Sequence, residues 1–386
     1  MRDFRLAHVL GFEIRIDASW FVIFFLVLWS FTVAVFPSRV SGLGGGVYFA
    51  LGLAGSLLFF ATLLAHELAH SVVARAKGIA VEGITLFVFG GVARTRSEAR
   101  SPGDEFVIAG VGPLASVLIA LALFGLAVAG QQLGLSIAVI VLLEYIALLN
   151  LALAIFNLLP GFPLDGGRMF RAVLWKMTGS MRRATRIATM GGRWIGYALM
   201  GLGALSALRG AVVGGLWLVL IGWFLRNAAV STEREQMANE LLEGVRADQI
   251  MTETPVAVPA ELSLERFFEE IVRPSRFNVF PAVSGETVVG VVSVKSLETV
   301  SRDRWPAAQV REVMTPLSAE EIVQAEDPMP AVLDRIRASA SHQVLVRDRG
   351  RIAGIITPRE IATWLEHARQ LEILERRAQP AKGKGA

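Results

Sequence analysis

The amino-acid sequence predicts a polytopic α-helical membrane protein with about six transmembrane helices, followed by a soluble α/β domain made of two similar units. Three observations lead to this prediction. Hydrophobic residues make up 53% of the 386-residue chain and charged residues only 19%, whereas soluble domains carry about 25% charge. Six apolar segments are long enough, or nearly so, to cross a bilayer. After Arg226 the sequence becomes polar, and one pattern occurs twice in that region.

The six apolar segments define a predicted transmembrane domain at residues 1–230. The first segment follows charged residues and has no small-residue cleavage site, so we expect an uncleaved span. The last two are joined by a tight connection around Arg209, which is typical of a helical hairpin. The segments cover residues 18–36, 47–73, 106–129, 135–158, 187–208 and 211–226.

Basic residues are concentrated in the loops on one side of these spans, and the opposite loops carry only Arg39 and Arg209. Cytoplasmic loops are enriched in Lys and Arg. We therefore expect a multi-pass protein of the cell (inner) membrane with both termini and the polar region in the cytoplasm. The same asymmetry explains the net charge of +4, so nucleic acid is not an expected partner. The basic loop residues are Arg75, Lys77, Arg94, Arg96, Arg100, Arg168, Arg171, Lys176, Arg182, Arg183 and Arg186.

The second span contains the sequence HELAH at residues 66–70. On a helix, this spacing places His66 and His70 one turn apart on one face, where both can bind one zinc ion. Glu67 would lie beside the ion and act as general base toward a bound water. The alternative is a pair of hydrogen-bonded histidines at a helix end. Three ionisable side chains near membrane depth are costly without a function or a partner, which favours the zinc site.

A zinc ion that keeps one position for water needs a third protein ligand. The chain has no cysteine, and a carboxylate is the better candidate. Asp165, in the sequence PLDGG, follows the fourth span on the side where the second span ends, and so lies at a similar depth. The alternative is a helix-capping aspartate next to turn glycines. The shared depth favours a zinc ligand.

The HExxH sequence in an early span, followed by NLLPGFPLDG at residues 157–166, resembles the site-2 protease family of intramembrane zinc metalloproteases. The resemblance covers about residues 1–230. It implies hydrolysis of a peptide bond within or near the transmembrane segment of a single-span, membrane-tethered substrate. The implied site consists of one Zn²⁺ held by His66, His70 and Asp165, with Glu67 as the catalytic base.

Three other segments have counterparts in the same family. Asn157 matches a family asparagine that positions or polarises the scissile carbonyl, with a hydrogen bond between helices as the equal alternative. The sequence AGVGPLAS at 109–116 resembles a segment near the family's active site, with Ser116 where relatives often have asparagine. Its glycines permit close helix packing. Residues 83–95 are predicted to form a β-hairpin whose edge pairs with an unwound substrate strand, or else an ordinary surface hairpin.

Two polar residues lie inside the fourth predicted span. Asn150 is seven residues before Asn157, so both should face the interior of the helix bundle. Glu144 lies about half-way along the span, where we expect a buried carboxyl that is protonated or hydrogen-bonded.

The polar region resembles a tandem of CBS (cystathionine-β-synthase) repeats at residues 247–370. Each repeat begins with Met-Thr and contains a glycine turn that ends in Ser or Thr, at Gly290–Ser293 and Gly354–Thr357. The repeats are expected at about 247–305 and 310–370, with a linker helix at 231–246 and a disordered tail at 371–386.

CBS pairs often bind adenine nucleotides, so the resemblance implies ATP, ADP or AMP as a ligand that regulates the protease. The family has Asp at the positions of Ser296 and Glu360. A structural module that forms a homodimer is the equal alternative. The implied nucleotide contacts are Ser293, Ser296, Thr357 and Glu360.

Two other functions fit part of the pattern. A membrane transporter or channel with a CBS regulator would need no general base, so HExxH and Asp165 argue against it. A protease-like scaffold without activity is disfavoured because His66, Glu67, His70 and Asp165 are all present.

Overall fold

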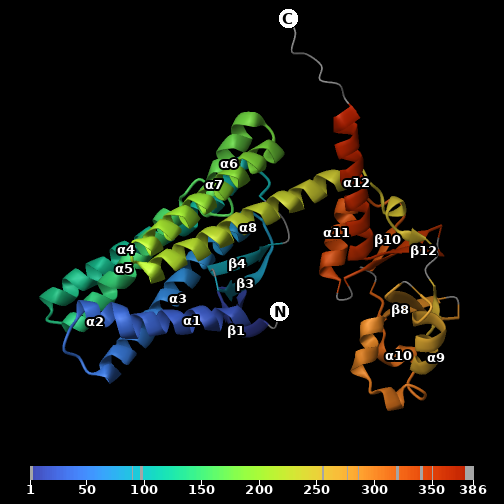
Figure 1. Cartoon of the computed structure of the whole chain (residues 1–386), viewed down its shortest axis with the longest axis horizontal. Coiled ribbons are helices and arrows are strands. Elements are labelled where there is room, and N and C mark those ends of the chain that lie inside the picture. Colours follow the sequence, from blue (N-terminus) through green and yellow to red (C-terminus); the bar gives the residue numbers. More distant parts are fainter. Residues whose placement is uncertain are drawn as a thin grey trace, which may run out of the picture. The chain divides into compact units, whose positions relative to one another are not determined.

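The computed structural model describes residues 3–88, 90–95, 99–253, 256–275, 277–285, 287–318, 321–339, 342–349 and 351–378. They belong to two compact units, Met1–Arg234 and Glu235–Ala386. The first unit is mainly helical and contains one sheet, and the second contains two small sheets with helices (Figure 1).

Long apolar helices make up most of the first unit. Five helical segments are long and apolar enough to cross a membrane: Ala18–Arg39, Gly45–Ala76, Pro102–Gln132, Ile137–Asn157 and Gly214–Leu242. The predicted span at 187–208 is also helical, but its helix carries four arginines in its first half and is not among the five. The helices are α1 (Ala18–Ser30), α2 (Phe36–Arg39), α3 (Gly45–Ala76), α4 (Pro102–Gln132), α5 (Ile137–Asn157), α6 (Asp165–Thr178), α7 (Met181–Leu208) and α8 (Val212–Leu242), with a π-helical turn η1 (Phe31–Val35) between α1 and α2.

Helix α4 packs against three other helices, α3, α5 and α6. Its first turn is capped by Ser101, whose Oγ accepts a hydrogen bond of 3.1 Å from the backbone N–H of Asp104. Because α4 touches both the helix with the HELAH sequence and the helix that begins with Asp165, it is the natural scaffold for a site between them.

A four-stranded sheet in the order β1-β2-β3-β4 completes the first unit. The structure confirms the predicted hairpin at residues 83–95, which is formed by β3 and β4. Strands β1 and β2 were not predicted from the sequence. Alternating residues of β2 and β3 form the core of the sheet, including Phe12, Ile14, Ile84 and Leu86. The strands are β1 (Asp3–Val9), β2 (Phe12–Asp17), β3 (Val81–Phe87) and β4 (Gly90–Thr95).

The second unit contains two similar four-stranded sheets, β6-β7-β8-β9 and β10-β11-β12-β5. Its strands are β5 (Thr252–Glu253), β6 (Val258–Pro259), β7 (Val279–Ser284), β8 (Thr287–Ser293), β9 (Thr315–Pro316), β10 (Ile322–Gln324), β11 (Val344–Asp348) and β12 (Arg351–Ile356). Its helices are α9 (Leu264–Arg266), α10 (Val310–Val313), α11 (Met329–Ala338) and α12 (Pro358–Ala378), with the π-helical η3 (Phe267–Val272) and the 3₁₀ turns η2 (Ala247–Gln249), η4 (Val294–Thr299) and η5 (Arg302–Arg304).

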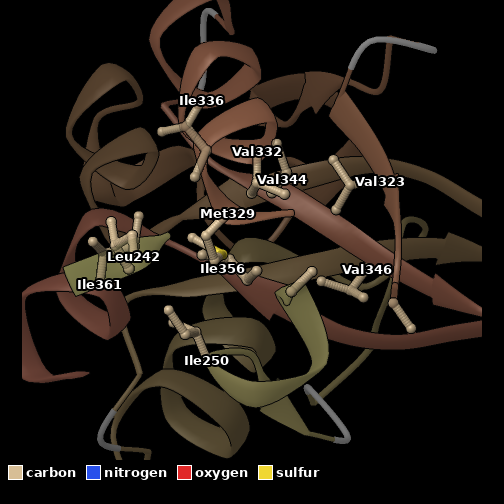
Figure 2. Close-up of a cluster of buried hydrophobic side chains, with 12 residues drawn as sticks. Leu242, Ile250, Val323, Met329, Val332, Ile336, Val344, Val346, Ile356 and Ile361 are labelled. Carbon is tan, nitrogen blue, oxygen red and sulfur yellow. The ribbon is translucent and has the colours of Figure 1, made fainter. Parts of the chain in front are cut away.

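The two repeats of this unit exchange their first strands. Strand β5, from the start of the first repeat, pairs with β12 of the second repeat, and β9 pairs with β8 of the first. One hydrophobic core accordingly combines Leu242 and Ile250 with side chains of the second repeat, among them Met329 and Val344 (Figure 2). Each repeat therefore needs residues that lie outside its own stretch of sequence.

Two expectations about single segments are wrong. The tail was expected to be disordered from residue 371, but α12 continues to Ala378, because this stretch consists of strong helix formers and its first proline is Pro380; residues 379–386 lie outside the described residues. Glu144 was expected to be buried but is exposed. It shares its helical face with Leu148 and Leu151, which are exposed as well.

Asn150 is buried, as predicted. Its Nδ2 donates hydrogen bonds to Thr62 Oγ1 on α3, at 3.0 Å, and to the carbonyl of Ile146, at 2.9 Å. A polar side chain inside a helix bundle is thus used to join two spans.

Candidate metal centre

His66 and His70 lie on one face of α3, and Asp165 is the first residue of α6. All three side chains are buried. The Nε2 atoms of the two histidines are 3.2 Å apart, and Asp165 Oδ2 is 3.2 Å from each of them. The structure therefore brings the three residues together as an equilateral triangle of potential ligand atoms.

Close backbone packing places Asp165 at this point. A Cβ atom on Gly166 would lie 2.2 Å from the carbonyl oxygen of Leu158, and one on Gly167 would lie 2.2 Å from the carbonyl carbon of Gly161. The glycines after Asp165 let α6 begin directly against the backbone of Leu158 and Gly161 in the preceding loop. The start of a helix also stabilises a carboxylate through the helix dipole.

Helix α4 contacts the other ring nitrogen of each histidine. His70 Nδ1 is 2.6 Å from the carbonyl oxygen of Ile108, and His66 Nδ1 is 2.9 Å from Ser116 Oγ. Between them, Gly112 has no side chain: a Cβ atom there would lie 2.1 Å from His70 Nε2 and 2.7 Å from His66 Nε2. The two imidazoles therefore pack directly on the backbone of α4.

A buried ion pair connects α4 to the helix that begins with Asp165. Arg171 Nε donates a hydrogen bond of 2.7 Å to Glu105 Oε1, and both side chains are buried. The Arg171 guanidinium also lies over the ring of Phe162, 5.0 Å from its centroid. Buried charges of this kind are tolerated only when paired, so the pair fixes the position of α6 on α4.

The environment of Asp165 favours its charged form. Burial raises the pKa of its carboxyl, but the two neighbouring imidazoles outweigh burial and hold this pKa below its ordinary range. Asp165 therefore offers an anionic oxygen between two imidazoles at neutral pH.

Glu67 directly follows His66 on α3, whereas Asn157 lies on another helix, α5. Glu67, half-buried on α3, packs against β4, because a Cβ atom on Gly91 would lie 2.5 Å from Glu67 Cγ. Asn157 is half-buried and is the last residue of α5. Neither the Glu67 carboxylate nor the Asn157 amide is part of the triangle of ligand atoms described above.

Known proteins resemble the chain over nearly its whole length. Residues 54–139 and 132–199 match Peptidase family M50, and residues 247–301 and 310–367 match the CBS domain. The relative Rip3 of Mycobacterium tuberculosis is 35% identical over 95% of this chain and 94% of its own length. The chain belongs to peptidase family M50, the site-2 proteases. It combines a metalloprotease of this family with a CBS pair.

Two further proteins are similar to this chain. The relative sll0528 of Synechocystis is 31% identical over 94% of this chain and 96% of its own. The names of Rip3 and sll0528 both contain the words zinc metalloprotease. The solved site-2 protease of Methanocaldococcus jannaschii matches 60% of this chain and 95% of its own, with 28% identity and a TM-score of 0.40.

The cluster of this M50 chain fits a zinc ion. Tetrahedral zinc with bonds of about 2.0–2.1 Å places neighbouring ligand atoms about 3.3–3.4 Å apart, and the three observed separations are 3.2 Å. Two nitrogens and one carboxylate oxygen are also ligands that zinc prefers. Three electron-rich atoms that converge in this way are stabilised by a cation between them.

The nucleotide contacts implied by the CBS resemblance form two equivalent pairs. Ser293 Oγ accepts a hydrogen bond of 3.1 Å from the backbone N–H of Ser296 at the start of η4. In the second repeat, Glu360 in the first turn of α12 accepts hydrogen bonds from the backbone N–H and the hydroxyl of Thr357, the residue before that helix. In both repeats these residues cap the helical turn that follows a strand.

The contacts to the Nδ1 atoms of the two histidines were not predicted from the sequence. Ile108 and Glu105 had no predicted role, Arg171 was predicted only as a basic residue of the cytoplasmic side, and no partner was predicted for the Ser116 hydroxyl. The available signal was the i, i+4, i+8 spacing of Ile108, Gly112 and Ser116, which places a carbonyl, a gap and a hydroxyl on one helical face.

Proposed function

We propose that this chain is an intramembrane zinc endopeptidase that holds one Zn²⁺ with His66, His70 and Asp165. The observation that carries the proposal is the triangle of two Nε2 atoms and one carboxylate oxygen with sides of 3.2 Å. Its position in α3, a helix long and apolar enough to cross a membrane, supports cleavage at membrane depth. Only a functional site justifies so many ionisable groups there.

The chemistry follows from the residues around the triangle. Bound zinc would supply a water of lowered pKa and a Lewis acid for the peptide carbonyl. Glu67 is the residue that takes the proton from the attacking water and returns it to the leaving nitrogen. Asn157, at the end of α5, is the proposed donor to the scissile carbonyl. The equal alternative for Asn157 is a hydrogen bond between helices, of the kind that Asn150 makes to Thr62 Oγ1.

The proposed substrate is a membrane-tethered protein with a single transmembrane span. A helix buries its carbonyls in hydrogen bonds, so the substrate must unwind before cleavage. Strand β4 is the last strand in the order β1-β2-β3-β4, and its Gly91 packs against Glu67. An unwound substrate strand that adds to the outer edge of β4 would bring its backbone next to the catalytic base.

The topology and the role of the CBS pair complete the proposal. The basic loops lie on the cytoplasmic side of the cell membrane, which places both termini and the CBS pair in the cytoplasm. We assign to the CBS pair either adenine-nucleotide binding at Ser293, Ser296, Thr357 and Glu360 or the formation of a homodimer. Calorimetry with ATP, ADP and AMP separates the two, because only the first produces heat of binding.

The test compares the purified wild-type protein with Glu67→Gln, using metal analysis and cleavage of candidate single-span substrates. The variant should keep its zinc, because Glu67 is not part of the ligand triangle, and should lose cleavage by at least about 100-fold, as expected for loss of a general base. Cleavage at the wild-type rate by Glu67→Gln would refute Glu67 as the base.

A further inference from the structure

The two histidines of the proposed zinc site are supported in different ways. His70 Nδ1 faces a main-chain oxygen, the carbonyl of Ile108, at 2.6 Å. His66 Nδ1 faces a side chain, Ser116 Oγ, at 2.9 Å. Both contacts are buried and come from α4. The contact of His70 is therefore made by the backbone, whatever residue stands at position 108, whereas the contact of His66 requires a hydroxyl at position 116.

The spacing on α4 makes both contacts together. Ile108, Gly112 and Ser116 are separated by four residues each and lie on one face of the helix. Gly112 leaves the room that the two Nε2 atoms occupy, since a Cβ atom there would be 2.1 Å from one and 2.7 Å from the other. The backbone of α4 is thus close enough to the two imidazoles for Ile108, one turn before Gly112, and Ser116, one turn after it, to contact them.

The chemistry of the two partners differs. A carbonyl oxygen only accepts, so the Ile108 contact places a proton on His70 Nδ1 and, in the neutral imidazole, leaves the Nε2 lone pair free for a metal. A serine hydroxyl can either accept or donate. Toward a His66 whose Nε2 binds zinc, the Ser116 oxygen must accept a hydrogen bond from Nδ1–H. Partners of this type orient the ring and raise the basicity of the ligand.

We propose that Ser116 is the positioning residue of His66: its hydroxyl accepts the Nδ1–H hydrogen bond and so directs Nε2 toward the zinc ion. The proposal depends on the zinc site proposed above and adds to it a side chain outside the ligand set. It states that zinc affinity, and not only the packing of α3 on α4, depends on the oxygen of residue 116.

The experiment measures zinc affinity of the full-length protein in detergent by competition with a chromophoric chelator, and thermal unfolding of the zinc-free protein. Ser116→Ala removes the oxygen without adding volume. Ser116→Thr and Ser116→Val have the same shape, and only the former keeps the hydroxyl. The comparison between them separates the hydrogen bond from packing.

Ser116→Ala should weaken zinc binding about 10- to 100-fold, as is typical for the loss of such a partner. Ser116→Thr should bind zinc at least about 10-fold more tightly than Ser116→Val, while the zinc-free forms of these two variants unfold at similar temperatures. Equal zinc affinity of wild type and Ser116→Ala, or of Ser116→Thr and Ser116→Val, would overturn the proposal. A wild-type protein that binds no zinc would instead refute the proposed function itself.

Discussion

At the scale of single residues, the site depends on two glycines that have no side chain as well as on the side chains that form it. Gly112 on α4 and Gly91 on β4 carry no side chain at the points where α3 presents the two histidines and Glu67. Each lets a backbone approach an ionisable side chain closely. Gly112 was expected only to permit close helix packing. The structure gives a more specific reason for a glycine at this position, because the two imidazoles occupy the place where a side chain would lie.

Gly112→Ala tests this reading. The added methyl group would lie 2.1 Å from His70 Nε2, a distance that real atoms do not adopt, so one ring must move away from Asp165. We expect the variant to lose most of its zinc, as measured by metal analysis after purification. The matched control is Gly110→Ala on the same helix, whose new atom would meet only Met169 at 3.7 Å. Equal zinc loss in both variants would contradict the explanation.

At the scale of elements, α4 and α7 determine where the ligands lie. Helix α4 supports both histidines and holds α6 through the Arg171–Glu105 pair. Helix α7 packs against the loop before Asp165, where the N–H of Phe162 donates a hydrogen bond of 3.1 Å to the carbonyl of Ala188. Removal of one partner from a buried ion pair typically costs about 3–5 kcal/mol because the other charge is left unpaired, so substitution of either residue should disturb the packing of α6 on α4.

Gly192→Ala tests the role of α7. A Cβ atom at Gly192 would lie 1.9 Å from the carbonyl oxygen of Phe162, so the loop that leads to Asp165 must shift. We expect a lower unfolding temperature and reduced zinc content. Gly201→Ala on the same helix has nothing within 4 Å of its new atom and should be neutral in both measurements. Wild-type zinc content and stability in Gly192→Ala would show that the loop is not held by α7.

The sequence predicted these elements unevenly. The long spans and the HELAH sequence were visible because apolar length and helical spacing are local properties. Strands β1 and β2 were not predicted, because the alternation of Phe12, Ile14 and Ile16 with polar residues is short and lies in the charged flank of the first span. Glu144 was placed in the interior from its polarity alone, whereas its helical face, shared with Leu148, points outward.

The contacts of Ile108 and Ser116 could not be derived from one sequence. They depend on the rotation of α4 about its axis, and that rotation is set by packing against α3 and α6 and not by the local pattern. Asp165 was found more easily, because two spans that end on one side of a membrane place their last turns at one depth.

At the scale of the whole molecule, one chain contains two units that are built in different ways. The first is built around a buried polar cluster among apolar helices. The second is a CBS pair in which β5 joins the sheet of the second repeat and β9 that of the first. Because strands are exchanged and Leu242 lies in the core of the second repeat, the repeats depend on each other for a complete fold.

The central claim is that His66, His70 and Asp165 hold a single zinc ion. The most direct measurement is the zinc content of the full-length protein and of the variant His66→Ala/His70→Ala/Asp165→Ala, purified in parallel and compared by size-exclusion chromatography to establish that both are folded. The account predicts one zinc per wild-type chain and none in the variant. Equal zinc in the two proteins, or a wild-type protein that cleaves substrate without zinc, would contradict it.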